Sequence, residues 1–144
     1  MYERMMVIPM VALLLAADAP KDEAVQQEVR KLQGTWKVVS FEASGTDQTA
    51  KGPKEIVIKG DELRGLAPNV KFRIDPAKKP KTLDLIDKGD SKKIFPLIYE
   101  LKDDELKIVF PLVQASKGEQ PKRPDSFQTK DKPLALLTAK REKP

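Results

Sequence analysis

Apolar and polar residues alternate with a period of two along most of the chain after Gly34. Val70, Phe72 and Ile74 share one face of such a segment, and the two residues between them are basic. One apolar face and one polar face are typical of strands in an antiparallel sheet. The same alternation occurs at residues 54–59, 83–85, 97–101, 106–110 and 134–138.

Turn residues separate these segments at short intervals. The sequence KGD at 59–61 predicts a tight hairpin, since glycine supplies the positive φ that such turns need. The sequence KDD at 102–104 predicts a second hairpin. We expect about eight short strands, and closure into a barrel leaves them without exposed sheet edges. The expected fold class is mainly β: an antiparallel barrel preceded by a short N-terminal helix.

Residues 1–19 have the pattern of a secretory signal peptide. An uncharged apolar run of 13 residues, Met5 to Ala17, follows Arg4, and small residues come at its end. The run is shorter than the about 20 residues that a membrane-spanning helix needs. We expect cleavage after Ala17 or Ala19, export to the periplasm or beyond, and no membrane span in the mature protein. A retained apolar anchor is the alternative.

Residues 20–33 predict a short helix. Acids lie near its start, Arg30 and Lys31 lie near its end, and a narrow apolar stripe runs between them. The period changes from the helical value to two after Gly34. The barrel domain is therefore expected at residues 34–142.

The composition excludes several kinds of function. The 144-residue chain is long enough for one domain, and it contains neither cysteine nor histidine. The absence of cysteine excludes disulfides, thiol nucleophiles and zinc–thiolate sites. The absence of histidine excludes the usual general base near neutral pH. The serines have no partner base, and the paired acids fall at hairpin tips. We expect no catalytic residues, no metal site and no cofactor.

The net charge is mildly basic. Lys and Arg number 27 against 22 Asp and Glu, which gives +5, and acids are interspersed with the lysines. A nucleic-acid-binding protein concentrates its positive charge and interleaves aromatic residues with it. Aromatic residues make up only 6% of this chain. A nucleic-acid partner is therefore not expected.

The sequence LQGTWKV at 32–38 resembles the opening of lipocalin-like barrels. That resemblance implies that a basic residue at the end of the barrel packs over Trp36. Arg141 has the right position in the sequence, with Lys140 as a substitute. A guanidinium stacked on the indole would contribute about 0.5–2 kcal/mol and close one end of the barrel. A ligand-stacking role for Trp36 is the alternative.

A longer series of motifs covers nearly all of residues 28–142. It includes KFRIDP at 71–76, IYEL at 98–101 and KRE at 140–142. Together the motifs are similar to an uncharacterised exported small-domain family that is expanded in planctomycete bacteria. This resemblance implies a lipocalin-like (calycin-type) β barrel and export, and it implies no established activity.

The densest charge lies at residues 75–84, DPAKKPKTLD. Lys78, Lys79 and Lys81, together with Arg123, are candidates for a binding site for phosphate, sulfate or a sulfated glycan. The alternative is a solvated hairpin in which the first aspartate caps the turn and the second pairs with a lysine.

The motif Arg123-Pro124-x-x-Phe127 is a second candidate. We expect Phe127 to enter the core and Pro124 to fix the start of a strand. Arg123 is then placed to hydrogen-bond a neighbouring loop or a ligand.

Two functions stay open on these grounds. The first is an exported, non-enzymatic interaction protein of the cell envelope, with a barrel filled by side chains and loops that contact a protein or a glycan. The second is a binding module that holds a small apolar or anionic ligand in the barrel mouth or loops. We favour the first, because eight short strands leave an interior barely wide enough for side chains.

Overall fold

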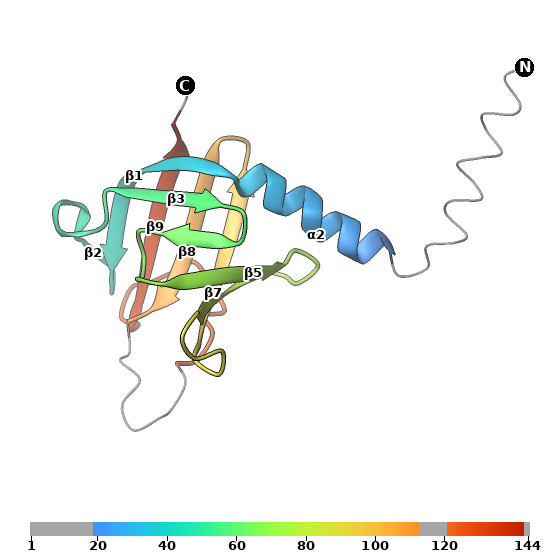
Figure 1. Ribbon diagram of the computed structural model, residues 1–144. Helices are drawn as coiled ribbons and strands as arrows, with labels where there is room; N and C mark the ends of the chain where they lie inside the picture. The colour runs from blue at the N-terminus through green and yellow to red at the C-terminus, as the bar shows by residue number, and fades with distance from the viewer. Residues whose placement is uncertain (1–18, 113–120, 143–144) are drawn as a thin grey trace, which may run out of the picture.

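The computed structural model describes residues 19–112 and 121–142, with side chains from residue 23 onward (Figure 1). The signal peptide expected at 1–19 lies, except for its last residue, outside this part of the chain. The elements are α2 (Ala19–Leu32), β1 (Gly34–Ala43), β2 (Thr46–Asp47), the 3₁₀ helix η1 (Thr49–Lys51), β3 (Glu55–Lys59), β4 (Glu62–Arg64), β5 (Val70–Asp75), β6 (Lys81–Asp87), β7 (Ile94–Lys102), β8 (Glu105–Pro111) and β9 (Leu134–Arg141).

The strands form one antiparallel sheet that closes on itself. Strands β1 and β3 to β9 follow one another around the sheet, and β9 pairs back to β1 along residues 36–43. β2 pairs only with the end of β1. The expected fold class is confirmed: the protein is mainly β, with a closed antiparallel barrel of eight strands and one described helix before it.

The period-two pattern sets which side chains face inward. On β5, Phe72 and Ile74 are buried while Lys71 and Arg73 are exposed. On β1, a bulge between residues 38 and 40 shifts the alternation by one position, so Phe41 returns to the inside. The alternation read from the sequence therefore gives the correct face for β5, whereas the bulge in β1 is visible only in the structure.

One contiguous hydrophobic cluster fills the inside of the barrel. Leu32 of α2 and Trp36 of β1 belong to it, and both are 0% exposed. Burying one large apolar side chain contributes about 1.5–3 kcal/mol, so this cluster dominates the stability. Its other buried members are Ile56, Ile58, Leu63, Phe72, Ile74, Leu83, Leu85, Leu97, Tyr99, Leu106, Ile108, Leu137 and Ala139.

The two ends of the barrel are built differently (Figure 1). The turns after β3, β5 and β7 lie where α2 meets the barrel, and we call this the helix end. The connections after β1, β4, β6 and β8 lie at the opposite end, the loop end. α2 contacts β5 and continues away from the barrel beside the β5–β6 turn.

Residues 121–133, which we call the strap, lie against the outside of the barrel. Phe127 packs there with Ile98, Val109 and Leu134 in a second hydrophobic cluster. Ile98 and Val109 occupy outward positions, so they need a cover from outside the sheet. Phe127 therefore packs in a hydrophobic cluster, as expected, but this cluster lies outside the barrel. The expectation that Pro124 fixes the start of a strand is wrong, because β9 begins only at Leu134.

β4 and β5 form the shortest seam of the barrel. They are joined at the single pair Glu62 and Lys71, whereas β5 and β6 pair over six residues. After β4, Gly65 has a φ of +114° and passes close to the start of β3. A Cβ added at Gly65 would lie 2.3 Å from the carbonyl oxygen of Glu55. The close passage of the chain past the start of β3 therefore depends on a glycine at this position.

The variant Gly65→Ala is expected to lose about 3 kcal/mol or more of unfolding free energy, because alanine meets both an unfavourable φ and a backbone oxygen. Gly60→Ala is the matched control, since Gly60 also has a positive φ but nothing lies within 4 Å of an added Cβ. We expect the control to lose only about 1 kcal/mol. Urea unfolding followed by tryptophan fluorescence measures both, and equal losses would contradict the tight passage at Gly65.

Candidate functional site

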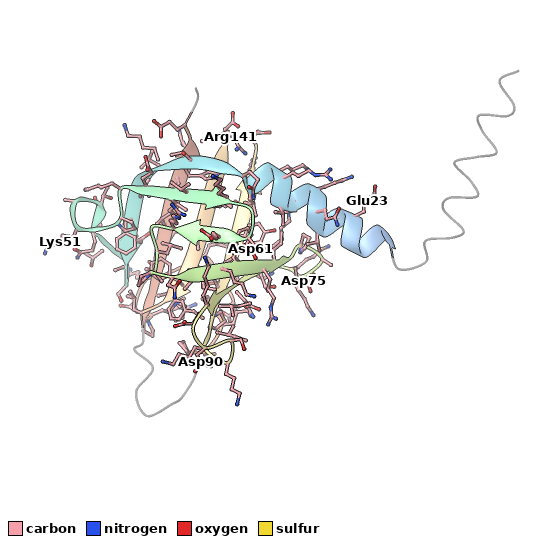
Figure 2. All side chains as sticks on the ribbon, in the orientation of Figure 1. Glu23, Lys51, Asp61, Asp75, Asp90 and Arg141 are labelled. Carbon is pink, nitrogen blue, oxygen red and sulfur yellow. The ribbon has the colours of Figure 1, made fainter. Side chains whose placement is uncertain are left out.

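The helix end is organised around the Arg141 guanidinium group, labelled in Figure 2. Its central carbon lies 4.3 Å from the centroid of the Trp36 ring, so the stack expected from the sequence is present. The same group donates hydrogen bonds to the Gln33 carbonyl oxygen at 2.7 Å and to the Lys31 carbonyl oxygen. Trp36 donates its indole N–H to the Leu32 carbonyl oxygen at 2.8 Å.

These bonds satisfy carbonyl groups that the end of α2 leaves without partners inside the helix. Positive charge is also favourable there, because the C-terminal end of a helix carries a partial negative charge. Asp104 accepts a bond from Nε of Arg141 at 3.2 Å and helps to orient the guanidinium. Trp36 is fully buried, which leaves it no open face for stacking a ligand. The pair therefore closes the helix end.

Lys81 lies under α2 and does not project from the lysine-rich turn. Its ammonium group donates to Oε2 of Glu28 at 2.7 Å, and the Tyr99 hydroxyl donates to the same oxygen at 3.0 Å. Lys81 points inward because alternate residues of a strand share one face of the sheet, and Leu83 and Leu85 of β6 face the core. Glu28 is only 7% exposed, so this cluster fixes α2 on the barrel.

Burial raises the pKa of the Tyr99 hydroxyl, and the Glu28 carboxylate beside it raises this pKa further. Tyr99 therefore keeps its proton well above the pH at which a solvated tyrosine loses it. The protonated hydroxyl serves as a hydrogen-bond donor to Glu28 and is not poised to act as a base.

Arg123 of the strap bonds to the outer face of the barrel. One of its terminal nitrogens donates to Oδ1 of Asp84 at 2.6 Å, and the other donates to the Leu97 carbonyl oxygen at 2.8 Å. Arg73 of β5 donates through Nε to the other oxygen of Asp84 at 3.1 Å. Asp84 is 9% exposed and holds two guanidinium groups, so it fastens the strap to the sheet.

The anion site expected from the sequence is not assembled in that form. Lys78 and Lys79 are exposed in the β5–β6 turn. Lys81 lies beneath the helix and Arg123 lies on the outer face, and each already has a carboxylate partner. The structure brings neither of these two side chains to the lysines of the turn.

The β5–β6 turn itself has the geometry of a capped hairpin. Asp75, which Figure 2 shows at the side of the barrel near α2, accepts a hydrogen bond from the Ala77 amide at 3.1 Å. This agrees with the alternative expectation for the turn. The second aspartate differs from that expectation, because Asp84 pairs with arginines and not with a lysine.

The loop end carries half-buried aromatic side chains. The rings of Phe41 and Phe110 stack with centroids 5.9 Å apart, and Phe95 also packs against the core cluster. A shallow hollow of about 480 Å³ is lined by residues 64–69, and Leu66 connects it to the core. The three phenylalanines offer apolar surface to a small molecule, whereas the hollow is lined by the polar Arg64 and Asn69 as well as by Leu66.

Sequence reasoning missed three residues of these clusters. Glu28 had a readable signal, because an acid within the apolar stripe of a helix needs a buried partner. Tyr99 and Arg73 were read only as members of alternating strands. Their partners come from other strands and from the helix, and the pattern of one strand does not identify them.

Comparison of the chain with known proteins found no matching family model, no matching curated protein and no matching solved structure. Within residues 19–112 and 121–142, no helix is long and apolar enough to cross a membrane. The same residues contain no group of three or more side chains that could hold a metal ion. Fold and site together define a closed eight-stranded barrel with a helix fastened over one end.

Replacing Arg141 by lysine is expected to lower the unfolding free energy by about 1–3 kcal/mol, because lysine keeps the charge but cannot reach several acceptors with a planar fork. Lys140→Gln changes an exposed neighbour and is expected to stay within about 0.5 kcal/mol of the parent. Urea unfolding followed by circular dichroism measures both. Similar small effects in the two variants would show that the guanidinium contacts are not needed.

Tyr99 is expected to make the fold sensitive to alkali. Its folded pKa is raised, so its contribution is fully present below about pH 10, the unfolded value, and is lost as the pH rises further. The loss from this group approaches about 1.4 kcal/mol per pH unit. Tyr99→Phe should remove that part of the slope in urea unfolding between pH 9 and about pH 11. Equal slopes in the parent and in Tyr99→Phe would contradict the raised pKa.

Proposed function

We propose that this chain is an exported, non-enzymatic interaction protein of the cell envelope, whose barrel is filled by its own side chains. The single observation that carries this proposal is the contiguous cluster of buried side chains inside the barrel. A transport or storage barrel needs an open apolar interior of about 300 Å³ or more, whereas packed side chains leave function to the outer surfaces.

The construction of the helix end supports the same conclusion. Trp36 and Arg141 close this end, and the buried bonds of Glu28 hold α2 across it. A ligand entering there would have to break several charge-assisted hydrogen bonds at once. Contact with a partner therefore falls to the outer face of the sheet and to the loop end.

Export is part of the proposal and rests on the signal-peptide pattern of residues 1–19. Cleavage after Ala17 would leave α2 whole, and cleavage after Ala19 would remove only its first residue. Both positions therefore preserve the contacts of Glu28 and of the helix C-terminus. The resemblance to exported planctomycete proteins with lipocalin-like barrels points in the same direction.

The loop end favours a second candidate function. Phe41, Phe95 and Phe110 are partly exposed around this end, and the hollow at residues 64–69 lies at the same end. A small apolar molecule seated on these rings would make the protein a binding module, without entering the filled interior.

Native mass spectrometry of the protein exported by a bacterial host, with its own N-terminus, tests the proposal. We expect a mass that starts at Asp18 or Pro20, with no adduct. An adduct that is lost on activation would contradict the filled-barrel proposal and favour the apolar ligand. Phe110→Ala would then test the loop end, because loss of the adduct in this variant would locate the ligand on the phenylalanines. A full-length mass would contradict signal cleavage.

A further inference from the structure

Arg73 is held by a buried carboxylate while most of its guanidinium group faces solvent. Its Nε bonds Asp84 at 3.1 Å, yet its side chain is 62% exposed. Within the described part of the chain, its two terminal nitrogens have no hydrogen-bond partner. These nitrogens form a planar fork that matches two oxygens of a carboxylate or a sulfate group.

Asp84 gives this fork a fixed orientation. The side chain of Asp84 is only 12% exposed, and its other oxygen is held by Arg123 at 2.6 Å. Arg123 is in turn anchored on the backbone of β7 through the Leu97 carbonyl oxygen. An arginine whose guanidinium is held in place loses less entropy on binding an anion than a free surface lysine does.

Further cations extend this surface along β5. Lys71 lies two residues before Arg73 on the same outward face, at a spacing of about 7 Å. Lys78 and Lys79 are exposed in the turn that follows the strand. We call Lys71, Arg73, Lys78 and Lys79 the β5 basic face.

Two of the acids next to the β5 basic face have hydrogen-bond partners. Asp75 accepts the Ala77 amide within the turn. Glu62 on β4 is bonded by Lys88 at 2.6 Å and by Arg64 at 3.2 Å, and these two cations lower the pKa of its carboxyl group. The four cations of the β5 basic face outnumber these two acids, so the face keeps a local excess of positive charge.

We propose that the β5 basic face binds a linear glycan that carries sulfate or carboxylate groups, with Arg73 as the oriented contact. This deepens the proposed function, on which it rests, by naming the chemical class of the partner. The lysines attract the chain of charges, and the fork of Arg73 takes one sulfate or carboxylate group in a defined geometry.

A glycan fits this surface better than a nucleic acid does. Single-stranded nucleic acids are held by stacking of bases on exposed aromatic side chains as well as by charge. In the described residues, the exposed large apolar side chains are Val39 and Leu112, and neither is aromatic. The β5 basic face offers charge and a hydrogen-bonding fork, with nothing for a base to stack on.

Isothermal titration with a heparin-derived octasaccharide and with an oligogalacturonate of equal length tests this proposal, using the exported protein of the mass-spectrometric experiment. We expect the parent to bind at least one of them and Arg73→Gln to weaken that binding by about tenfold. Arg73→Lys keeps the charge but lacks the planar fork, so we expect it to weaken binding nearly as much as Arg73→Gln does. Lys140→Gln is the matched control, with an expected change below about twofold.

The control lies on the opposite side of the barrel, because three strands separate β9 from β5 in either direction. Equal losses in Lys140→Gln and Arg73→Gln would overturn the proposal in favour of attraction by net charge alone. Failure of the parent to bind either oligosaccharide would also overturn it. Tighter binding of a single-stranded oligonucleotide of equal charge would overturn the assignment to a glycan.

Asp84→Asn gives an independent test of orientation. This change raises the net charge by one, so simple attraction predicts tighter binding of the oligosaccharide. An oriented Arg73 fork predicts weaker binding instead. If Asp84→Asn does not fold, Arg73→Lys decides: weaker binding than the parent supports the oriented fork, and equal binding overturns it. The proposed function and the glycan proposal can fail separately. An adduct in the mass spectrum contradicts the filled barrel. If there is no adduct and neither oligosaccharide binds, only the proposal that the β5 basic face binds a glycan is contradicted.

Discussion

The structure depends on one contact, the Arg141 guanidinium held between the Trp36 ring and the last carbonyl groups of α2. Arg141 belongs to the last strand and Trp36 to the first, so this contact forms only when the barrel has closed. It joins three elements that are far apart in the sequence. Because it also ends the helix, it decides where α2 leaves the barrel and therefore which end is covered.

The closed helix end has consequences for the rest of the molecule. With α2 in place, Glu28 receives its two donors, Lys81 and Tyr99, beneath the helix. A buried carboxylate without them would be costly, so helix and barrel stabilise each other. The interior is then filled by side chains, and its helix end is covered. On the outer face of the sheet, Asp84 is likewise a buried acid with basic partners, Arg73 and Arg123.

The sequence allowed the fold class to be predicted because alternation with a period of two is a local property of each strand. The stack of Arg141 on Trp36 was also predictable, from a resemblance and from the place of both residues at the ends of the barrel. The two arginine partners of Asp84 were not predictable. Arg73 lies opposite it because of the strand register, and Arg123 reaches it from the strap. The inward position of Lys81 could be predicted locally, since it lies two residues before Leu83 on the same side of β6. The lysines around it nevertheless favoured the interpretation as a solvated turn. Parity gives the face of a strand, whereas register and loop packing are long-range properties.

The most direct test of the central claim is hydrogen exchange of the Trp36 indole N–H, measured by NMR in increasing urea below the unfolding transition. This proton is bonded to the Leu32 carbonyl oxygen and lies in the buried junction. The account predicts that it exchanges only by global unfolding, with the same opening free energy as the slowest amides of β1 and β9. Exchange at a much lower free energy, in step with fraying of α2, would show that the junction opens by itself and does not hold the barrel closed.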